Sequence, residues 1–211
     1  MCFKVKGMNK KVSDDLAHIR LMMERSSRFI SLSGLSGIGA GVVGLVTGIF
    51  VMWFTNNKFQ FLKYNGFIPF ENEAIKILSG IGIAALLLAI FFGCFFTIRK
   101  SKRLGLKIWT TTTKKILVQL AIPLVVGGVF VLALLQYRLY GLIAGTTLIF
   151  YGLALVNAEK YTYSDIKYLG FLEIILGCLS LFFIGKGLLF WTIGFGVLHI
   201  VYGIILYRKY K

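Results

Sequence analysis

Two ionisable residues lie inside long apolar stretches near the end of the chain, where their chemistry would be unusual. Glu173 interrupts the apolar stretch 169–184, and His199 interrupts the stretch 187–206. A charged side chain at the centre of a bilayer costs at least about 2.5–3.5 kcal/mol, so such residues usually pair with one another or mark an ion pathway. A carboxylate beside an imidazole is therefore a candidate for a structural hydrogen bond or for a proton or cation site.

The spacing of small and polar residues predicts that these two side chains face each other. Both stretches carry one such stripe, with members three or four residues apart: Gly170, Glu173, Gly177 and Ser180 in the first, and Thr192, Gly196, His199 and Gly203 in the second. In a bilayer, small and polar stripes face protein. At about 1.5 Å per residue, both ionisable residues lie roughly 18–20 Å from the turn at residues 185–186, and so at the same depth.

Two amides would extend this candidate intramembrane polar site. Gln119 and Asn157 lie near the ends of their own apolar stretches, and we expect them at a slightly shallower level than the Glu173–His199 pair. Two interpretations stay open: an interhelical hydrogen bond, worth about 0.6 kcal/mol on average, or a functional proton or cation site. A single intramembrane histidine does not build a multi-histidine metal centre. No metal or cofactor is therefore expected. The chain carries no Ser/His/Asp arrangement, HExxH or CxxC motif, so no catalytic activity is expected, and an acid/base enzyme that uses Glu173 and His199 stays an alternative.

The composition places the whole chain in a membrane. Of its 211 residues 57% are hydrophobic and 15% are charged, whereas about a quarter of the residues in a soluble domain are charged. The long apolar runs predict an all-α, polytopic membrane protein with six transmembrane helices in three antiparallel hairpins. The predicted spans are residues 29–54, 74–98, 116–137, 140–156, 169–184 and 187–206.

The positive charge predicts the orientation. The net charge is +16, and nineteen of the 24 Lys and Arg residues fall in the N-terminal segment, in residues 99–115 and 158–168, and at the C-terminus. Cytoplasmic segments carry such an excess, so both termini are expected in the cytoplasm and the protein in the inner (plasma) membrane of a bacterium. A nucleic-acid-binding surface would not be divided by twenty-residue apolar runs, so no nucleic-acid partner is expected.

The polar segments indicate where partners would bind. Residues 1–28 are predicted to be a cytoplasmic segment, and the spacing within 13–28 predicts an amphipathic helix. This helix is interpreted as lying on the membrane surface. The alternative is that it docks a cytoplasmic partner. Residues 29–206 form the transmembrane domain, and 207–211 are a basic tail. The seven basic residues of 99–115 are expected to contact anionic lipid headgroups, at about 1 kcal/mol each.

Glycines predict where helices pack closely. The first span carries two GxxxG pairs, and the last two spans carry glycines on their polar stripes; the residues concerned are Gly37, Gly41, Gly44, Gly48, Gly177, Gly196 and Gly203. Small residues let helix backbones approach each other in lipid. The stripe on the first span also leaves room for a homo-oligomer.

The last third of the chain carries a resemblance. The turn NAEKYTYSDIKYLG, the stretch GLLFWTIGFGVLHIVYGI and the basic tail resemble uncharacterised small six-span bacterial membrane proteins over most of the chain. The hairpins of Gly-rich helices are more faintly similar to HdeD-type acid-resistance membrane proteins. Neither resemblance implies a role for a particular residue. The expected function is a structural, sensory or regulatory membrane component, and the alternative is a small transporter or proton-linked permease subunit that uses Glu173 and His199.

Overall fold

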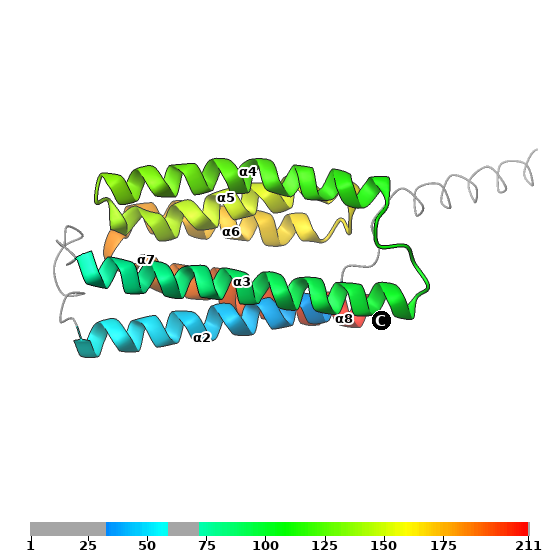
Figure 1. Cartoon of the computed structure of the whole chain (residues 1–211), viewed down its shortest axis with the longest axis horizontal. Helices are drawn as coiled ribbons and strands as arrows, with labels where there is room; N and C mark the ends of the chain where they lie inside the picture. The colour runs from blue at the N-terminus through cyan, green and yellow to red at the C-terminus, as the bar shows by residue number, and fades with distance from the viewer. Residues whose placement is uncertain (1–32, 59–71, 211) are drawn as a thin grey trace, which may run out of the picture.

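The computed structural model describes residues 33–58 and 72–210, which form helices and no strand within these ranges (Figure 1). The helices are α2 (Gly34–Lys58), α3 (Asn72–Arg103), α4 (Thr111–Gln136), α5 (Ile143–Ala158), α6 (Ile166–Phe182), α7 (Gly187–Trp191) and α8 (His199–Lys209). Short 3-10 turns lie at η2 (Tyr140–Leu142), η3 (Glu159–Tyr161) and η4 (Ile184–Lys186), and the π-helical segment η5 (Thr192–Leu198) joins α7 to α8. The all-α prediction is confirmed. The predicted helix 13–28 and the first residues of the first span lie outside the described ranges.

Within residues 33–58 and 72–210, five helical segments are long and apolar enough to cross a membrane, as is typical of a multi-pass membrane protein. They are Gly34–Thr55, Ile75–Arg103, Thr111–Gln136, Tyr140–Tyr161 and Ile184–Lys209. Helix α6 has 17 residues and is therefore about 26 Å long. It is shorter than these five segments.

Helix α3 extends beyond the predicted end of the second span. It continues to Arg103, five residues past residue 98, and its last turn carries Lys100, Lys102 and Arg103. Cations at a helix C-terminus interact favourably with the helix dipole, so the helix persists where the apolar run stops. Helix α4 then starts with a capped turn, because the side chain of Thr110 accepts the backbone N–H of Thr113 at 3.1 Å.

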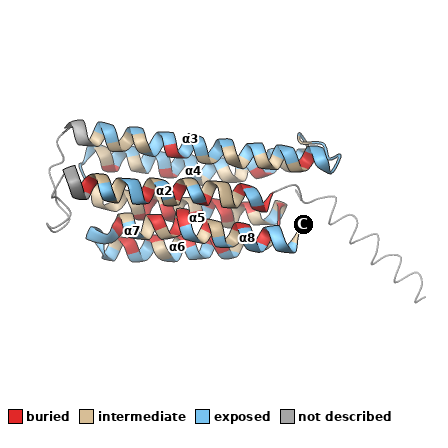
Figure 2. Ribbon diagram, turned by 90° about the horizontal axis from the view of Figure 1, so that it is seen from below, coloured by how far each residue is buried: buried red, intermediate tan, exposed pale blue. Residues whose placement is uncertain are grey.

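The helices pack as two groups that one helix connects. Helices α4, α5 and α6 contact one another in sequence order, and α2 contacts α3, η5 and α8. The continuous helix α7–η5–α8 joins the groups, because α7 contacts α5 and α6 whereas α8 lies along α2. Buried residues concentrate where these central helices meet, while α3 and α4 are largely exposed (Figure 2). Their exposed apolar side chains suit a lipid environment.

The closest helix contacts are made by glycines. A Cβ added to Gly203 would lie 2.5 Å from the backbone nitrogen of Ile38 on α2, and one on Gly177 would lie 2.8 Å from the carbonyl oxygen of Gly145 on α5. The glycines at which α2 packs on η5 or α8 are Gly34, Gly37, Gly41, Gly44, Gly48, Gly196 and Gly203. By contrast, Gly82 and Gly93 of α3 have no atom within 4 Å of such a Cβ. Close backbone approach therefore joins α8 to α2 and α6 to α5.

The tight turn between α4 and α5 holds a non-glycine residue in the left-handed region. Arg138 has a φ of 57°, and the next backbone N–H, that of Leu139, donates to the oxygen of Leu134 at 2.8 Å. This conformation costs an ordinary residue about 1 kcal/mol and a β-branched residue more. We expect Arg138→Gly to be neutral or to raise stability by up to about 1 kcal/mol, and Arg138→Val to lower it by about 1–2 kcal/mol. Thermal unfolding of both variants in one detergent measures this, and equal midpoints would contradict it.

Candidate functional site

The structure brings Glu173 and His199 together in the centre of the bundle. The Nδ1 atom of His199 lies 3.2 Å from Oε1 of Glu173, and the two side chains are 6% and 0% exposed. Glu173 comes from the middle of α6, and His199 from the junction of η5 and α8. The pair therefore links the α4–α5–α6 group to the helix that packs on α2.

Two hydrogen bonds set the orientation of the His199 ring. Its Nδ1 lies 3.0 Å from the carbonyl oxygen of Gly194, and its Nε2 lies 2.8 Å from the hydroxyl of Tyr151 on α5. A carbonyl oxygen only accepts, so Nδ1 carries a hydrogen and donates it. In the neutral imidazole, Nε2 then accepts the hydroxyl hydrogen of Tyr151. The ring is also stacked on Phe195, with centroids 5.8 Å apart.

The π-helical segment places the Gly194 carbonyl within reach of His199. The two residues are five positions apart, which is the spacing of a π-helical turn. Such turns are rare and are frequently found at functional sites. Gly194 also leaves room for the carboxylate, because a Cβ there would lie 2.5 Å from Oε2 of Glu173 and 2.5 Å from Cδ2 of Leu148.

The carboxylate of Glu173 can accept hydrogen bonds that no described neighbour donates. Both oxygens are buried and have no hydrogen-bond partner among the described residues. The 3.2 Å contact with His199 has the length of an ion pair, while the Nδ1 hydrogen is directed to Gly194. An unpaired buried polar group costs about 1–3 kcal/mol, and more when it is charged. A group that can bind a proton, and so lose its charge, sits at the centre of the site.

The two amides expected to extend the site do not reach it. Gln119 and Asn157 are half-buried, and no hydrogen bond joins either to the pair in the described part of the chain. Asn157 follows Tyr151 by six residues, about 9 Å along α5. Gln119 precedes Gly127 by eight residues, about 12 Å along α4, and it is Gly127 that packs on Phe150, beside Tyr151. The residues that complete the site are instead Tyr151 and Gly194.

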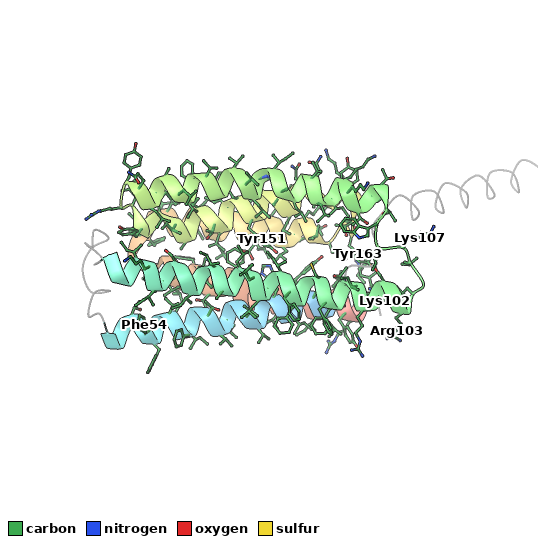
Figure 3. All side chains as sticks on the ribbon, in the orientation of Figure 1. Phe54, Lys102, Arg103, Lys107, Tyr151 and Tyr163 are labelled. Carbon is green, nitrogen blue, oxygen red and sulfur yellow. The ribbon has the colours of Figure 1, made fainter. Side chains whose placement is uncertain are left out.

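A second polar cluster closes the basic end of the bundle. Asp165, at the start of α6, accepts hydrogen bonds from Lys209 Nζ at 2.8 and 3.0 Å and from the Tyr210 hydroxyl at 3.1 Å. The ring of Tyr163 stacks on Tyr210 at 4.0 Å, and burial, with a smaller effect of Tyr210, raises the pKa of Tyr163 to about 12. Figure 3 shows Tyr163, Lys102, Arg103 and Lys107 at this end, Phe54 at the other and Tyr151 between them.

The described residues hold no metal-binding cluster, and the comparisons with known proteins assign no role to the site. Within residues 33–58 and 72–210, no three His, Cys, Asp or Glu side chains converge as metal ligands would. Comparison with protein-family models, with curated proteins and with solved structures finds no significant match. The chemistry of the site therefore follows from Glu173, His199, Tyr151 and the Gly194 carbonyl.

Proposed function

We propose that the chain crosses the membrane six times, in three antiparallel hairpins with both termini in the cytoplasm. The hairpins are α2–α3, α4–α5 and α6–α7–η5–α8, and the 17 residues of α6 meet the lower limit for a span. The basic residues outside the apolar core support this orientation. Those at one end are Arg99, Lys100, Lys102, Arg103, Lys107, Lys114, Lys115, Lys160, Lys167, Arg208 and Lys209, and those at the other, among the described residues, are Lys58, Lys76, Arg138 and Lys186. At the first of these ends, residues 99–115 would contact anionic lipid headgroups.

The function that the site supports best is that of a structural, sensory or regulatory membrane component without catalytic activity of its own. The observation that carries this proposal is the buried Glu173–His199 pair, held by Tyr151 and Gly194 between the two helix groups. The pair ties α5 and α6 to η5 and α8. A change at these side chains would be passed to both groups because α8 lies along α2.

One observation favours a second candidate, a small transporter or proton-linked permease subunit. Both oxygens of Glu173 are buried without a hydrogen-bond partner among the described residues. Ionisable residues inside spans often belong to proton relays or substrate pathways. A carboxylate that only held the helices together would be expected to use its oxygens in hydrogen bonds.

A proton-flux assay in liposomes that contain the full chain distinguishes the two candidate functions. We expect a pH gradient to produce no proton flux above that of empty liposomes, and we expect Glu173→Gln and His199→Ala each to lower the unfolding temperature. The exposed Lys186→Ala serves as a control that changes charge outside the bundle core. Flux that is present in the wild type and lost in Glu173→Gln, with stability retained, would establish the transporter and reject the first candidate.

A further inference from the structure

The turn between α5 and α6 receives a lysine side chain from each of the two helix groups. The Nζ atom of Lys100, on α3, lies 5.8 Å from the centroid of the Tyr163 ring, and that of Lys115, on α4, lies 5.9 Å from the centroid of the Tyr161 ring. Both distances are within the range of a cation–π interaction. The two tyrosines are two residues apart in the chain. The turn therefore brings cations of α3 and α4 to one place, although α3 packs on α2 and α4 packs on α5.

Positive charge at this end far exceeds the negative charge available to balance it. Among the described residues, the only acidic side chains at this end are Glu159 and Asp165, against the eleven Lys and Arg residues named above. Asp165 accepts both of its hydrogen bonds with Lys from Lys209. Lys100 donates to an uncharged acceptor, the carbonyl oxygen of Tyr210, at 3.3 Å. The basic end of the bundle therefore attracts an anion from outside the chain.

The loop that joins α3 to α4 places apolar side chains beside these cations. Leu104, Leu106 and Trp109 are all exposed, and Lys107, in the same loop, is exposed as well (Figure 3). Exposed tryptophan and leucine beside lysine are typical of a segment at the membrane interface. The exposed apolar faces of α3 and α4 continue from this loop along the bundle (Figure 2). The surroundings of the cations therefore suit an anion that carries an apolar tail.

We propose that Lys100 and Lys115 bind the phosphate of an anionic phospholipid at the basic ends of α3 and α4, with the acyl chains along the apolar faces of these helices. An ammonium group has three N–H donors, so it can lie over a tyrosine ring and contact a phosphate oxygen together. The proposal deepens the proposed function and rests on its orientation, in which this end meets anionic headgroups. It adds a defined headgroup site, formed by Lys100, Lys115, Tyr161 and Tyr163.

A lipid in the headgroup site would act on the fold as well as on the charge. Helix α3 belongs to the group that packs around α2, whereas α4 belongs to the group with α5 and α6. One phosphate held by a lysine from each group links them at the basic end, where the lysines would otherwise repel each other. A ligand that binds only the folded protein stabilises it. Anionic lipid should therefore raise the unfolding temperature of the protein.

Native mass spectrometry of the full chain in detergent measures this binding by titration with two lipids that have the same acyl chains. Phosphatidylglycerol is the anionic probe and phosphatidylcholine the zwitterionic one. We expect the anionic lipid to bind about tenfold more tightly. Lys115→Gln, at an exposed position, should weaken its binding about fivefold, as should Lys100→Gln. Lys115→Arg, which keeps the charge, should bind as the wild type does.

Lys167→Gln is the matched control, because it removes the same charge at the same end of the bundle. Lys167 also lies over a tyrosine ring, with its Nζ atom 5.4 Å from the centroid of Tyr168, but it belongs to α6, which packs on α5 and α7. This variant should keep the wild-type affinity. Equal weakening by Lys167→Gln and Lys115→Gln would show a diffuse effect of charge and overturn the headgroup site.

Two further results would overturn the proposal. Equal binding of the two lipids would show that the charge of the headgroup is not recognised. Displacement of phosphatidylglycerol by an equal concentration of inorganic phosphate would show that the lysines take a free anion and not a lipid. Affinity in detergent does not depend on which side of the membrane the basic end faces. Failure of the proposed function appears elsewhere, as unchanged unfolding temperatures in Glu173→Gln and His199→Ala, so the two failures are distinguishable.

Discussion

Gly203→Ala is expected to lower the stability of the protein by about 2–3 kcal/mol, although it adds only one methyl group. The new Cβ would lie 2.5 Å from the nitrogen of Ile38 and 2.7 Å from the carbonyl oxygen of Gly34, both in the backbone of α2. A side chain could turn away from this overlap, whereas a helix backbone cannot. Helix α2 must therefore move away from α8 and lose the neighbouring glycine contacts. Thermal unfolding of both proteins in the same detergent measures the loss.

Gly82→Ala on α3 provides the control for this substitution. It also replaces a glycine within a helix by alanine, but no atom lies within 4 Å of the added Cβ. Helix propensity alone makes alanine better than glycine by up to about 1 kcal/mol, so we expect this variant to be neutral or more stable. If both variants lost stability equally, the contact between α2 and α8 would not be the reason.

His199→Ala is expected to cost about 3 kcal/mol, because it removes the imidazole that lies 3.2 Å from the buried Glu173 carboxylate, whose oxygens have no hydrogen-bond partner among the described residues. The hydrogen bonds lost would by themselves account for less, since interhelical bonds in membranes average about 0.6 kcal/mol. An unpaired charge at mid-depth costs at least about 2.5–3.5 kcal/mol, and this effect dominates. The measurement is again the unfolding midpoint, here at neutral pH.

The double variant Glu173→Gln/His199→Ala separates charge from packing. Removing the carboxylate together with the imidazole abolishes the unpaired charge, so the double variant should recover most of the stability and remain about 1 kcal/mol below wild type. Tyr151→Phe, which removes only the hydrogen bond to Nε2, should cost about 1 kcal/mol. A double variant no more stable than His199→Ala would show that the charge of Glu173 is not responsible.

Much of the central site could be predicted because lipid restricts what a polar residue can do. Glu173 and His199 lie on stripes of glycine and hydroxyl residues at helical spacing, and such stripes face protein in a bilayer. Counting residues from the turn at 185–186 placed both at one depth, and the structure has them 3.2 Å apart. A stripe does not by itself locate a contact, however, since Gly82 and Gly93 of α3 have no neighbour within 4 Å.

The partners of the pair could not be predicted in the same way. Tyr151 lies in an apolar run, where a tyrosine is expected to pack like an apolar side chain. Its hydroxyl has a partner, His199, only because α5 and α8 approach each other in the fold. The π-helical segment Thr192–Leu198 gave no signal in the sequence, because the stripe Thr192, Gly196, His199 and Gly203 has the three- and four-residue spacing of an ordinary helix. Gln119 and Asn157 were placed by depth alone, and their offsets along α4 and α5 keep them from the pair.

Helix α6 differs from its neighbours in length, and this has a consequence for the surrounding lipid. It has 17 residues, and its apolar side chains Phe171, Ile175 and Phe182 are exposed, whereas the apolar segment of α3 has 29 residues. A hydrocarbon core about 30 Å thick exceeds the roughly 26 Å of α6 but not the length of α3. If α6 spans the membrane, the bilayer must thin beside it or the polar residues that flank it must extend to the interface, each at a modest free-energy cost. The protein should therefore favour thin membranes and gather short-chain lipids along its α6 side.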